Sequence, residues 1–137
     1  MAEKRPGDLG APSRDEFTAL LGISVTRYGS GHTGARLTTT AQHANPNGNL
    51  HGALMYAVAA AAIAAAANDE DHSGVMSSVS IEYLAPGTIG DELWAEVDRA
   101  ASTDGEDIFT GTVRRGEGGD LLAWVRGRGT RRTRRRQ

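Results

Sequence analysis

The segment from Asn45 to Gly52 combines residue types that can hold an oxygen atom of a substrate. It reads Asn-Pro-Asn-Gly-Asn-Leu-His-Gly and leads directly into an apolar, alanine-rich run, residues 50–67, which predicts a helix. The backbone N–H groups at the start of a helix have no partner inside the helix and lie at the positive end of its dipole. We therefore expect this junction to bind an anionic or carbonyl oxygen.

The predicted helix carries no charged residue, and its only clearly polar side chains are His51 and Tyr56. A helix that is apolar on every face has to be enclosed by other structure. Because alanine is a weak membrane residue and the run barely reaches the length of a membrane span, we expect a buried helix and no membrane association. The chain has no cysteine and no apolar N-terminal signal, which fits a cytoplasmic protein.

Alternating apolar and polar residues predict the elements around this helix. A short helix is expected over residues 14–21, capped by Ser13 and ended by Gly22. Strand patterns lie on both sides of the long helix, at residues 23–25, 35–39, 75–84, 92–100, 107–115 and 121–128. Short links between the strands demand antiparallel pairing. The pattern predicts an α+β fold in which a curved antiparallel sheet of about six strands wraps one long buried helix.

The length of 137 residues predicts one domain, which we place at residues 14–130. Residues 1–13, rich in proline, glycine and charge, are expected to be disordered. Residues 126–137 hold 7 of the 15 Lys and Arg residues, which leaves 8 basic against 17 acidic residues elsewhere, a net charge of −9. We expect the Arg-rich tail, residues 131–137, to be disordered. Nucleic-acid binding is not favoured, since no aromatic residue lies among these arginines, but polyanion binding through the tail is an open alternative.

Two motifs carry a family resemblance. Asn-x-x-Gly-x-x-His-Gly (Asn45, Gly48, His51 and Gly52) is followed by an apolar helix and by Ser-Ile-Glu-Tyr-Leu-Ala-Pro-Gly at residues 80–87. This arrangement resembles the hotdog-fold acyl-CoA thioesterases, above all the phenylacetate-pathway (PaaI-like) and 4-hydroxybenzoyl-CoA thioesterases, over residues 14–130. The resemblance implies a hotdog fold and an acyl-CoA substrate, with no separate cofactor and no metal. It also implies a homodimer or homotetramer with sites at subunit boundaries.

The resemblance assigns roles to individual residues. The backbone N–H of Gly52 would polarise the thioester carbonyl, the side-chain amide of Asn45 would hold that carbonyl or the attacking water, and His51 would support the site. Further positions are candidates for binding the substrate: Asn47, Gly48, Tyr56, Ser78, Arg126 and Arg128.

One residue departs from the family pattern. The family places a carboxylate nine residues after the motif histidine, where it acts as nucleophile or general base from the neighbouring subunit, but here that position is Ala60. Three explanations are open. The chain is an engineered alanine variant, or another group activates the water, or the chain binds acyl-CoA without turning it over. The function is thus thioester hydrolysis or, as the alternative, acyl-CoA binding by a non-catalytic regulatory module.

Other polar residues have simpler interpretations. His32 and His43 are expected at the surface, and His72 is expected in a solvated loop after the long helix, since its spacing from nearby acids fits no usual zinc site. Glu82 lies on a predicted strand and is expected to face water.

Overall fold

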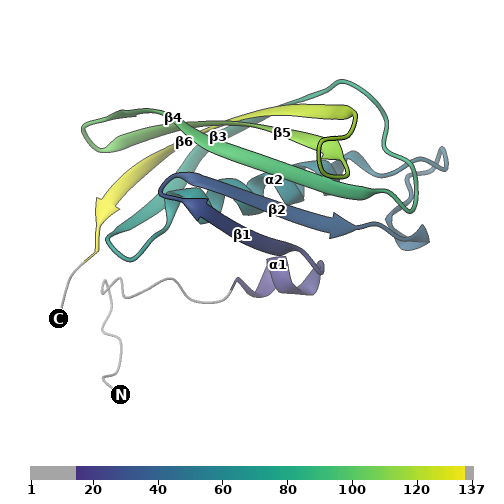
Figure 1. Cartoon of the computed structure of the whole chain (residues 1–137), viewed down its shortest axis with the longest axis horizontal. Helices are drawn as coiled ribbons and strands as arrows, with labels where there is room; N and C mark the ends of the chain where they lie inside the picture. Colours follow the sequence, from purple (N-terminus) through teal and green to yellow (C-terminus); the bar gives the residue numbers. More distant parts are fainter. Residues whose placement is uncertain (1–14, 135–137) are drawn as a thin grey trace, which may run out of the picture.

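A six-stranded antiparallel sheet curves around one long helix in the computed structural model, which describes residues 15–134 (Figure 1). The order of elements is α1 (Glu16–Leu20), β1 (Ser24–Gly29), β2 (His32–Thr38), a 3-10 turn (Ala41–His43), α2 (Gly52–Ala67), β3 (His72–Tyr83), β4 (Glu92–Thr103), β5 (Glu106–Arg115) and β6 (Leu121–Thr133). The predicted α+β class, the order of helices and strands and the antiparallel sheet are confirmed.

The strands follow the order β1-β2-β4-β5-β6-β3 across the sheet. Strand β3 therefore follows α2 in the chain but lies at the opposite edge of the sheet from β1. It pairs along its length with β6, from His72 opposite Thr133 to Tyr83 opposite Ala123. The other long edge of β3 has no partner strand within the described residues.

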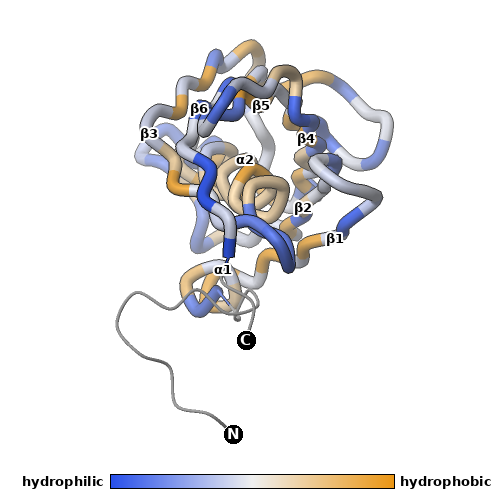
Figure 2. Tube along the Cα trace, turned by 90° about the vertical axis from the view of Figure 1, so that its left-hand side faces the viewer, coloured by the Kyte–Doolittle hydropathy of each residue, from blue (hydrophilic) through white to orange (hydrophobic). Residues whose placement is uncertain are grey.

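The alanine content of α2 lets the sheet approach it closely. Figure 2 shows α2 end-on at the centre, with the six strands in an arc around it. Val58, Ala59, Ala62 and Ile63 are fully buried there, because small side chains allow a helix and a sheet to pack without voids. One stripe of the helix is less covered and consists of Ala53, Tyr56, Ala57, Ala60 and Ala64. The predicted enclosure is thus confirmed for most of the helix surface, and this stripe is the exception.

Arginines from three different strands or their ends cover the C-terminal end of α2, which has no basic residue of its own in the last turn. Arg27 of β1 donates to the carbonyl oxygen of Ala65, and Arg99 of β4 donates to that of Ala66 over 3.3 Å. Arg134, just after β6, donates to the carbonyl oxygen of Asp69 over 2.7 Å. Arg27 and Arg99 face the negative end of the helix dipole and satisfy carbonyls that have no partner inside the helix, whereas Arg134 binds the turn just beyond α2.

Some boundaries differ from those predicted. Asp15, not Ser13, caps α1, since its carboxylate accepts from the backbone N–H of Thr18 over 3.0 Å. Ser13 and the predicted disordered segment, residues 1–13, lie outside the described residues. His72 does not lie in a solvated loop but is half-buried as the first residue of β3.

The sheet also runs past the domain boundary predicted at residue 130. Strand β6 continues to Thr133, because its last residues pair with His72, Ser73 and Gly74 of β3. Arg131 also donates to the buried Asp107 and to the carbonyl oxygen of Thr103. The expectation of a disordered tail is therefore wrong for residues 131–134, and residues 135–137 lie outside the described part of the chain. No helix in residues 15–134 is long and apolar enough to cross a membrane.

Candidate active site

The loop before α2 is held by the side chain of Asn45. Its carboxamide oxygen accepts hydrogen bonds from the backbone N–H groups of Asn47 (2.9 Å) and Asn49 (3.1 Å). Gly48 has a φ of +81°, a conformation that residues other than glycine rarely adopt. Since the oxygen is engaged in the loop, the amide nitrogen of Asn45 is left as a donor, and it has no acceptor within residues 15–134.

His51 is the N-cap of α2. Its Nδ1 accepts from the backbone N–H of Ala53 over 3.1 Å, so the proton of the neutral ring is assigned to Nε2. The backbone N–H of His51 donates to the carbonyl oxygen of His43 over 2.9 Å, which ties the cap to the 3-10 turn. With its Nδ1 lone pair engaged, His51 positions the helix start and is poorly placed to act as a general base.

Gly52 is the first residue of α2 and lies against Tyr83 at the end of β3. The Tyr83 hydroxyl donates to the carbonyl oxygen of Gly52 over 3.1 Å, and a Cβ at position 52 would lie 3.2 Å from the Tyr83 ring. Glycine at this position thus lets the ring approach closely. The backbone N–H of Gly52 has no acceptor within the described residues, as expected for the first turn of a helix.

A pocket of about 320 Å³ opens at this helix start. Its walls are mostly apolar or backbone, and its lining residues are Asn45, Asn49, Leu50, Gly52, Met55, Tyr83, Leu84, Ala85, Pro86 and Gly87. The two loops that form it are joined by the backbone N–H of Leu50, which donates to the carbonyl oxygen of Gly87 over 3.1 Å. In the part of the chain that the structure describes, no carboxylate and no histidine line this pocket. The arrangement can bind a neutral group with its carbonyl oxygen at the helix start.

Ala60 does not lie beside Gly52 of its own chain. The two positions are eight residues apart on the helix, a rise of about 12 Å. Ala60 is half-buried and belongs to the less covered stripe of α2. A side chain at position 60 is therefore too far along the helix to reach the pocket at Gly52 of its own chain.

The structure separates the other predicted substrate-binding residues into three places. Asn47 and Gly48 lie in the loop but do not line the pocket. Tyr56 is exposed on the stripe of α2, one turn before Ala60. Ser78, Arg126 and Arg128 are exposed on the outer face of the sheet, where Ser78 and Arg128 are cross-strand partners. Asn45 and Gly52 both line the pocket, and His51 caps the helix beside Gly52, whereas these three outer-face residues form a separate group.

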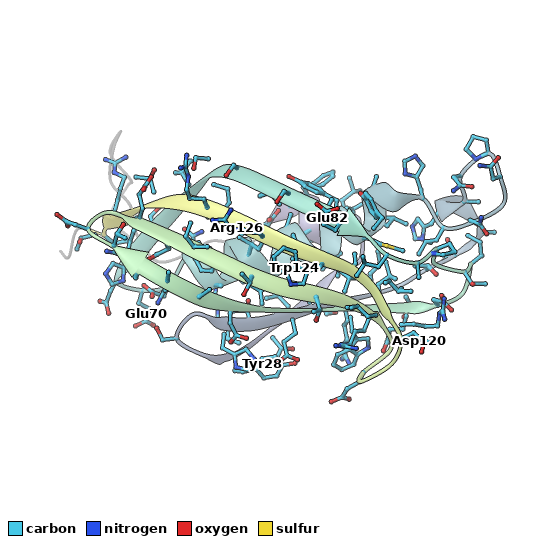
Figure 3. The ribbon with its side chains drawn as sticks, turned by 90° about the horizontal axis from the view of Figure 1, so that it is seen from above. Tyr28, Glu70, Glu82, Asp120, Trp124 and Arg126 are labelled. Carbon is cyan, nitrogen blue, oxygen red and sulfur yellow. The ribbon has the colours of Figure 1, made fainter. Side chains whose placement is uncertain are left out.

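Tyr83, Met55 and Leu84 are lining residues that sequence reasoning did not identify as part of the site. Tyr83 could have been identified from the sequence by its place in the motif of residues 80–87. Strand alternation puts its side chain on the opposite face of the sheet from that of Glu82. Glu82 is exposed and opposite Trp124 on the outer face, as Figure 3 shows, so it does not supply the missing carboxylate.

The acids after α2 form a structural turn. The Asp69 carboxylate accepts from the backbone N–H groups of His72 (2.6 Å) and Asp71 (2.8 Å). Partial burial raises the pKa of Asp69, but these hydrogen bonds and the His72 ring outweigh it, so the pKa lies below its ordinary value. Within residues 15–134 no group of three or more His, Cys, Asp or Glu residues could hold a metal ion.

Known proteins share this architecture. A sequence model of the Thioesterase superfamily matches residues 47–99, which include the start of α2 and the end of β3. The acyl-coenzyme A thioesterase PaaI of Escherichia coli (strain K12) is 33% identical over 81 residues, which are 59% of this chain. The match spans 58% of that relative's length.

Solved structures match over more of the chain. The structure of the E. coli PaaI protein from the phenylacetic acid degradation operon has a TM-score of 0.80 and 26% identity, covering 86% of this chain and 85% of its own. The TT0310 protein of Thermus thermophilus has a TM-score of 0.79 and 26% identity, covering 86% of this chain and 98% of its own.

Proposed function

We propose that this chain, which belongs to the thioesterase superfamily and has the hotdog fold, binds an acyl-CoA thioester at the start of α2. The observation that carries the proposal is the N–H of Gly52, which has no acceptor within the described residues and belongs to a residue that lines a partly apolar pocket of about 320 Å³. A thioester has a polarisable carbonyl oxygen attached to an apolar acyl group, and these two parts match the N–H and the pocket. The curated relative that it matches is named as an acyl-CoA thioesterase.

In this proposal the Gly52 N–H donates to the thioester carbonyl oxygen, on which negative charge develops when water attacks. A preorganised donor of this kind contributes about 3–4 kcal/mol to stabilising the transition state. The free amide nitrogen of Asn45 is the second donor near the same oxygen or the attacking water. Water adds to the carbonyl carbon, the carbon–sulfur bond breaks, and the products are a carboxylic acid and the thiol of CoA.

Hydrolysis also needs a group that activates the attacking water. Within the described residues no carboxylate lines the pocket, and position 60 carries a methyl group. We therefore propose that the chain as given binds the thioester and hydrolyses it slowly. The same observation favours the alternative function, an acyl-CoA-binding module without turnover. The enzyme proposal expects a carboxylate at position 60 to restore fast hydrolysis, whereas the binding-module alternative does not.

The proposal includes a second copy of the chain. The edge of β3 is free of a partner strand within the described residues, and the stripe of α2 with Tyr56 and Ala60 is incompletely covered. A dimer that covers both would bring Ala60 of one copy towards Gly52 of the other, which one chain cannot do across about 12 Å of helix. Sedimentation equilibrium should give a dimer or tetramer at micromolar concentration. A monomer would contradict the shared site.

The absence of cysteine is compatible with the reducing cytoplasm in which we propose that the protein works.

The deciding experiment compares Ala60→Asp with the unchanged chain on a panel of aliphatic and aromatic acyl-CoA thioesters. A carboxylate acting as general base accelerates such a step by roughly 10²–10⁴-fold. Ala64→Asp is the matched control, because residue 64 is half-buried on the same stripe one turn further on. Both substitutions introduce a charge on this stripe, and circular dichroism with thermal unfolding checks that both variants fold.

The enzyme proposal expects fast hydrolysis for Ala60→Asp and none above the starting level for Ala64→Asp. If a folded Ala60→Asp chain hydrolyses no thioester faster than the control, hydrolysis is rejected. Equilibrium dialysis with a non-hydrolysable acyl-CoA analogue then tests the binding-module alternative.

A further inference from the structure

The outer face of β6 presents an exposed aromatic ring in line with exposed arginines. Trp124, Arg126 and Arg128 alternate with buried residues along β6, so their side chains share one face. Figure 3 shows Trp124 and Arg126 on the outer face, away from α2. Successive members of the row are about 6.7 Å apart along the strand. This face has no part in the pocket at Gly52.

The neighbours of the two arginines in the sheet are chiefly hydroxyl groups. Arg126 is in register with Ser80 on β3 and Thr110 on β5, and Arg128 is in register with Ser78 and Ile108. Guanidinium groups surrounded by hydroxyls can donate several hydrogen bonds to one anion. Among the described residues, the single acid paired directly with the row is Glu82, which lies opposite Trp124 and so at the aromatic end. Glu96 and Asp98 of β4 continue the same rows two strands away from β6.

The two arginines differ from the arginines that stabilise the fold. Arg99 and Arg131 face Asp107, and Arg115 forms ion pairs with Asp91 and Asp120 over 2.9 Å each. Within residues 15–134 neither Arg126 nor Arg128 has an acid at ion-pair distance, and the one side-chain contact of Arg128 is with the Ser77 hydroxyl at 3.3 Å. Their charges are therefore available to a ligand.

Trp124 adds an independent feature that selects the kind of anion. Its side chain is 43% exposed although large apolar rings are normally covered. An exposed ring on a sheet face stacks well on a nucleobase, and nearby arginines then meet the phosphates. Inorganic anions alone would gain nothing from the ring.

We propose that Trp124, Arg126 and Arg128 form a binding site for a nucleotide that carries a diphosphate. The base stacks on Trp124, the Glu82 carboxylate lies near its exocyclic amino group, and the diphosphate lies across Arg126 and Arg128 with Ser78, Ser80 and Thr110 as further donors. The nucleotide is either a free nucleoside diphosphate or the nucleotide end of CoA, which share this chemistry. The site does not depend on whether the chain hydrolyses thioesters.

Tryptophan fluorescence can report on this site directly. The chain has two tryptophans, so Trp94→Phe leaves Trp124 as the single emitter. In this background, ADP should quench the emission in a saturable manner. Inorganic pyrophosphate should compete without quenching, since it cannot stack. Added salt should weaken the binding, because the contacts to phosphate are ionic.

Two substitutions and one control separate the site from nonspecific attraction. Arg126→Gln combined with Arg128→Gln should weaken ADP binding at least tenfold, since two charge-assisted contacts are lost. Trp124→Ala, followed by calorimetry, should weaken it about tenfold. Arg36→Gln removes an exposed arginine on β2 and should leave ADP binding unchanged. Thermal unfolding checks that each variant folds.

The outcomes are distinct. No saturable binding of ADP or CoA at millimolar concentration, or equal binding by the double variant, overturns the proposal. If CoA displaces ADP, and if the double variant has a raised KM for acyl-CoA with unchanged kcat, the natural ligand of this site is the nucleotide end of CoA. ADP binding that CoA does not displace identifies a separate nucleotide ligand. ADP binding is measured without turnover. The interpretation of the binding data therefore does not change if the thioesterase proposal fails.

Discussion

The hydroxyl of Tyr83 donates a hydrogen bond to the carbonyl oxygen of Gly52 over 3.1 Å, which joins the end of β3 to the first residue of α2. The contact holds the first turn of the helix in place. It also explains why residue 52 has no side chain, since a Cβ there would lie 3.2 Å from the Tyr83 ring. The group proposed to polarise the substrate is thus oriented by a residue 31 positions away in the sequence.

Tyr83→Phe tests this positioning role. The variant keeps the ring that lines the pocket and loses one hydrogen bond, worth about 0.5–1.5 kcal/mol. We expect kcat for acyl-CoA hydrolysis to fall by about 2–10-fold with KM nearly unchanged, measured in the Ala60→Asp background if the unchanged chain is too slow. Tyr28→Phe, at an exposed tyrosine of β1, is the control. An equal effect of both substitutions would contradict the role of Tyr83.

Replacing Gly52 tests the N–H donor itself. Gly52→Pro removes the N–H, whereas Gly52→Ala keeps it, and both variants place a Cβ against Tyr83. The backbone accepts proline here, because proline is tolerated in the first helical turn and His51 is extended (φ −66°, ψ 129°). We expect turnover by Gly52→Pro to be about 10²–10³-fold below that of Gly52→Ala. Similar turnover by the two folded variants would place the chemistry elsewhere.

The arginines at the C-terminal end of α2 are expected to stabilise the folded chain. Arg99→Met keeps the apolar stem but removes the donor to Ala66 and one of two cations facing the nearly buried Asp107. We expect the free energy of unfolding to fall by about 1–3 kcal/mol in urea denaturation. Arg132→Met, at an exposed residue of β6, should stay within about 0.5 kcal/mol of the unchanged chain. A loss at Arg99 no larger than at Arg132 would show that the helix end does not need this cation.

The Asp69 turn makes a pH prediction. Its pKa is lowered in the folded state, so the stability that its carboxylate contributes is fully present above the ordinary unfolded pKa of about 4. This contribution is lost as the pH falls through the lower folded value. In Asp69→Asn, which keeps an oxygen acceptor, the free energy of unfolding should therefore decline less between pH 5 and pH 3 than in the unchanged chain. Urea titrations at several pH values measure the difference, and parallel declines would refute the prediction.

Much of the fold could be predicted from local patterns. The apolar run of residues 50–67 has no polar face, so the need for an enclosing sheet follows from its composition alone. The alternation in the strands and the loop chemistry around Asn45 and Gly48 are similarly local, which is why the order of elements and the helix start agree with the structure. The position of the absent carboxylate is also local information, since it depends on a count of nine residues from His51 to Ala60.

Tertiary structure decided the features that depend on residues distant in the chain. The row of arginines after residue 125 has the composition of a solvated tail, yet Asp107 and Thr103 hold Arg131 in β6, and the carbonyl oxygens of Asp69 and His72 hold Arg134. The sequence alone determined an enclosed helix that carries alanine at position 60 and whose start we propose to bind an oxygen atom. Strand register decided which side chains meet that start. It also decided which arginines on the outer face have no acid nearby within residues 15–134, because a guanidinium is neutralised only by an acid that the fold brings within a few ångströms.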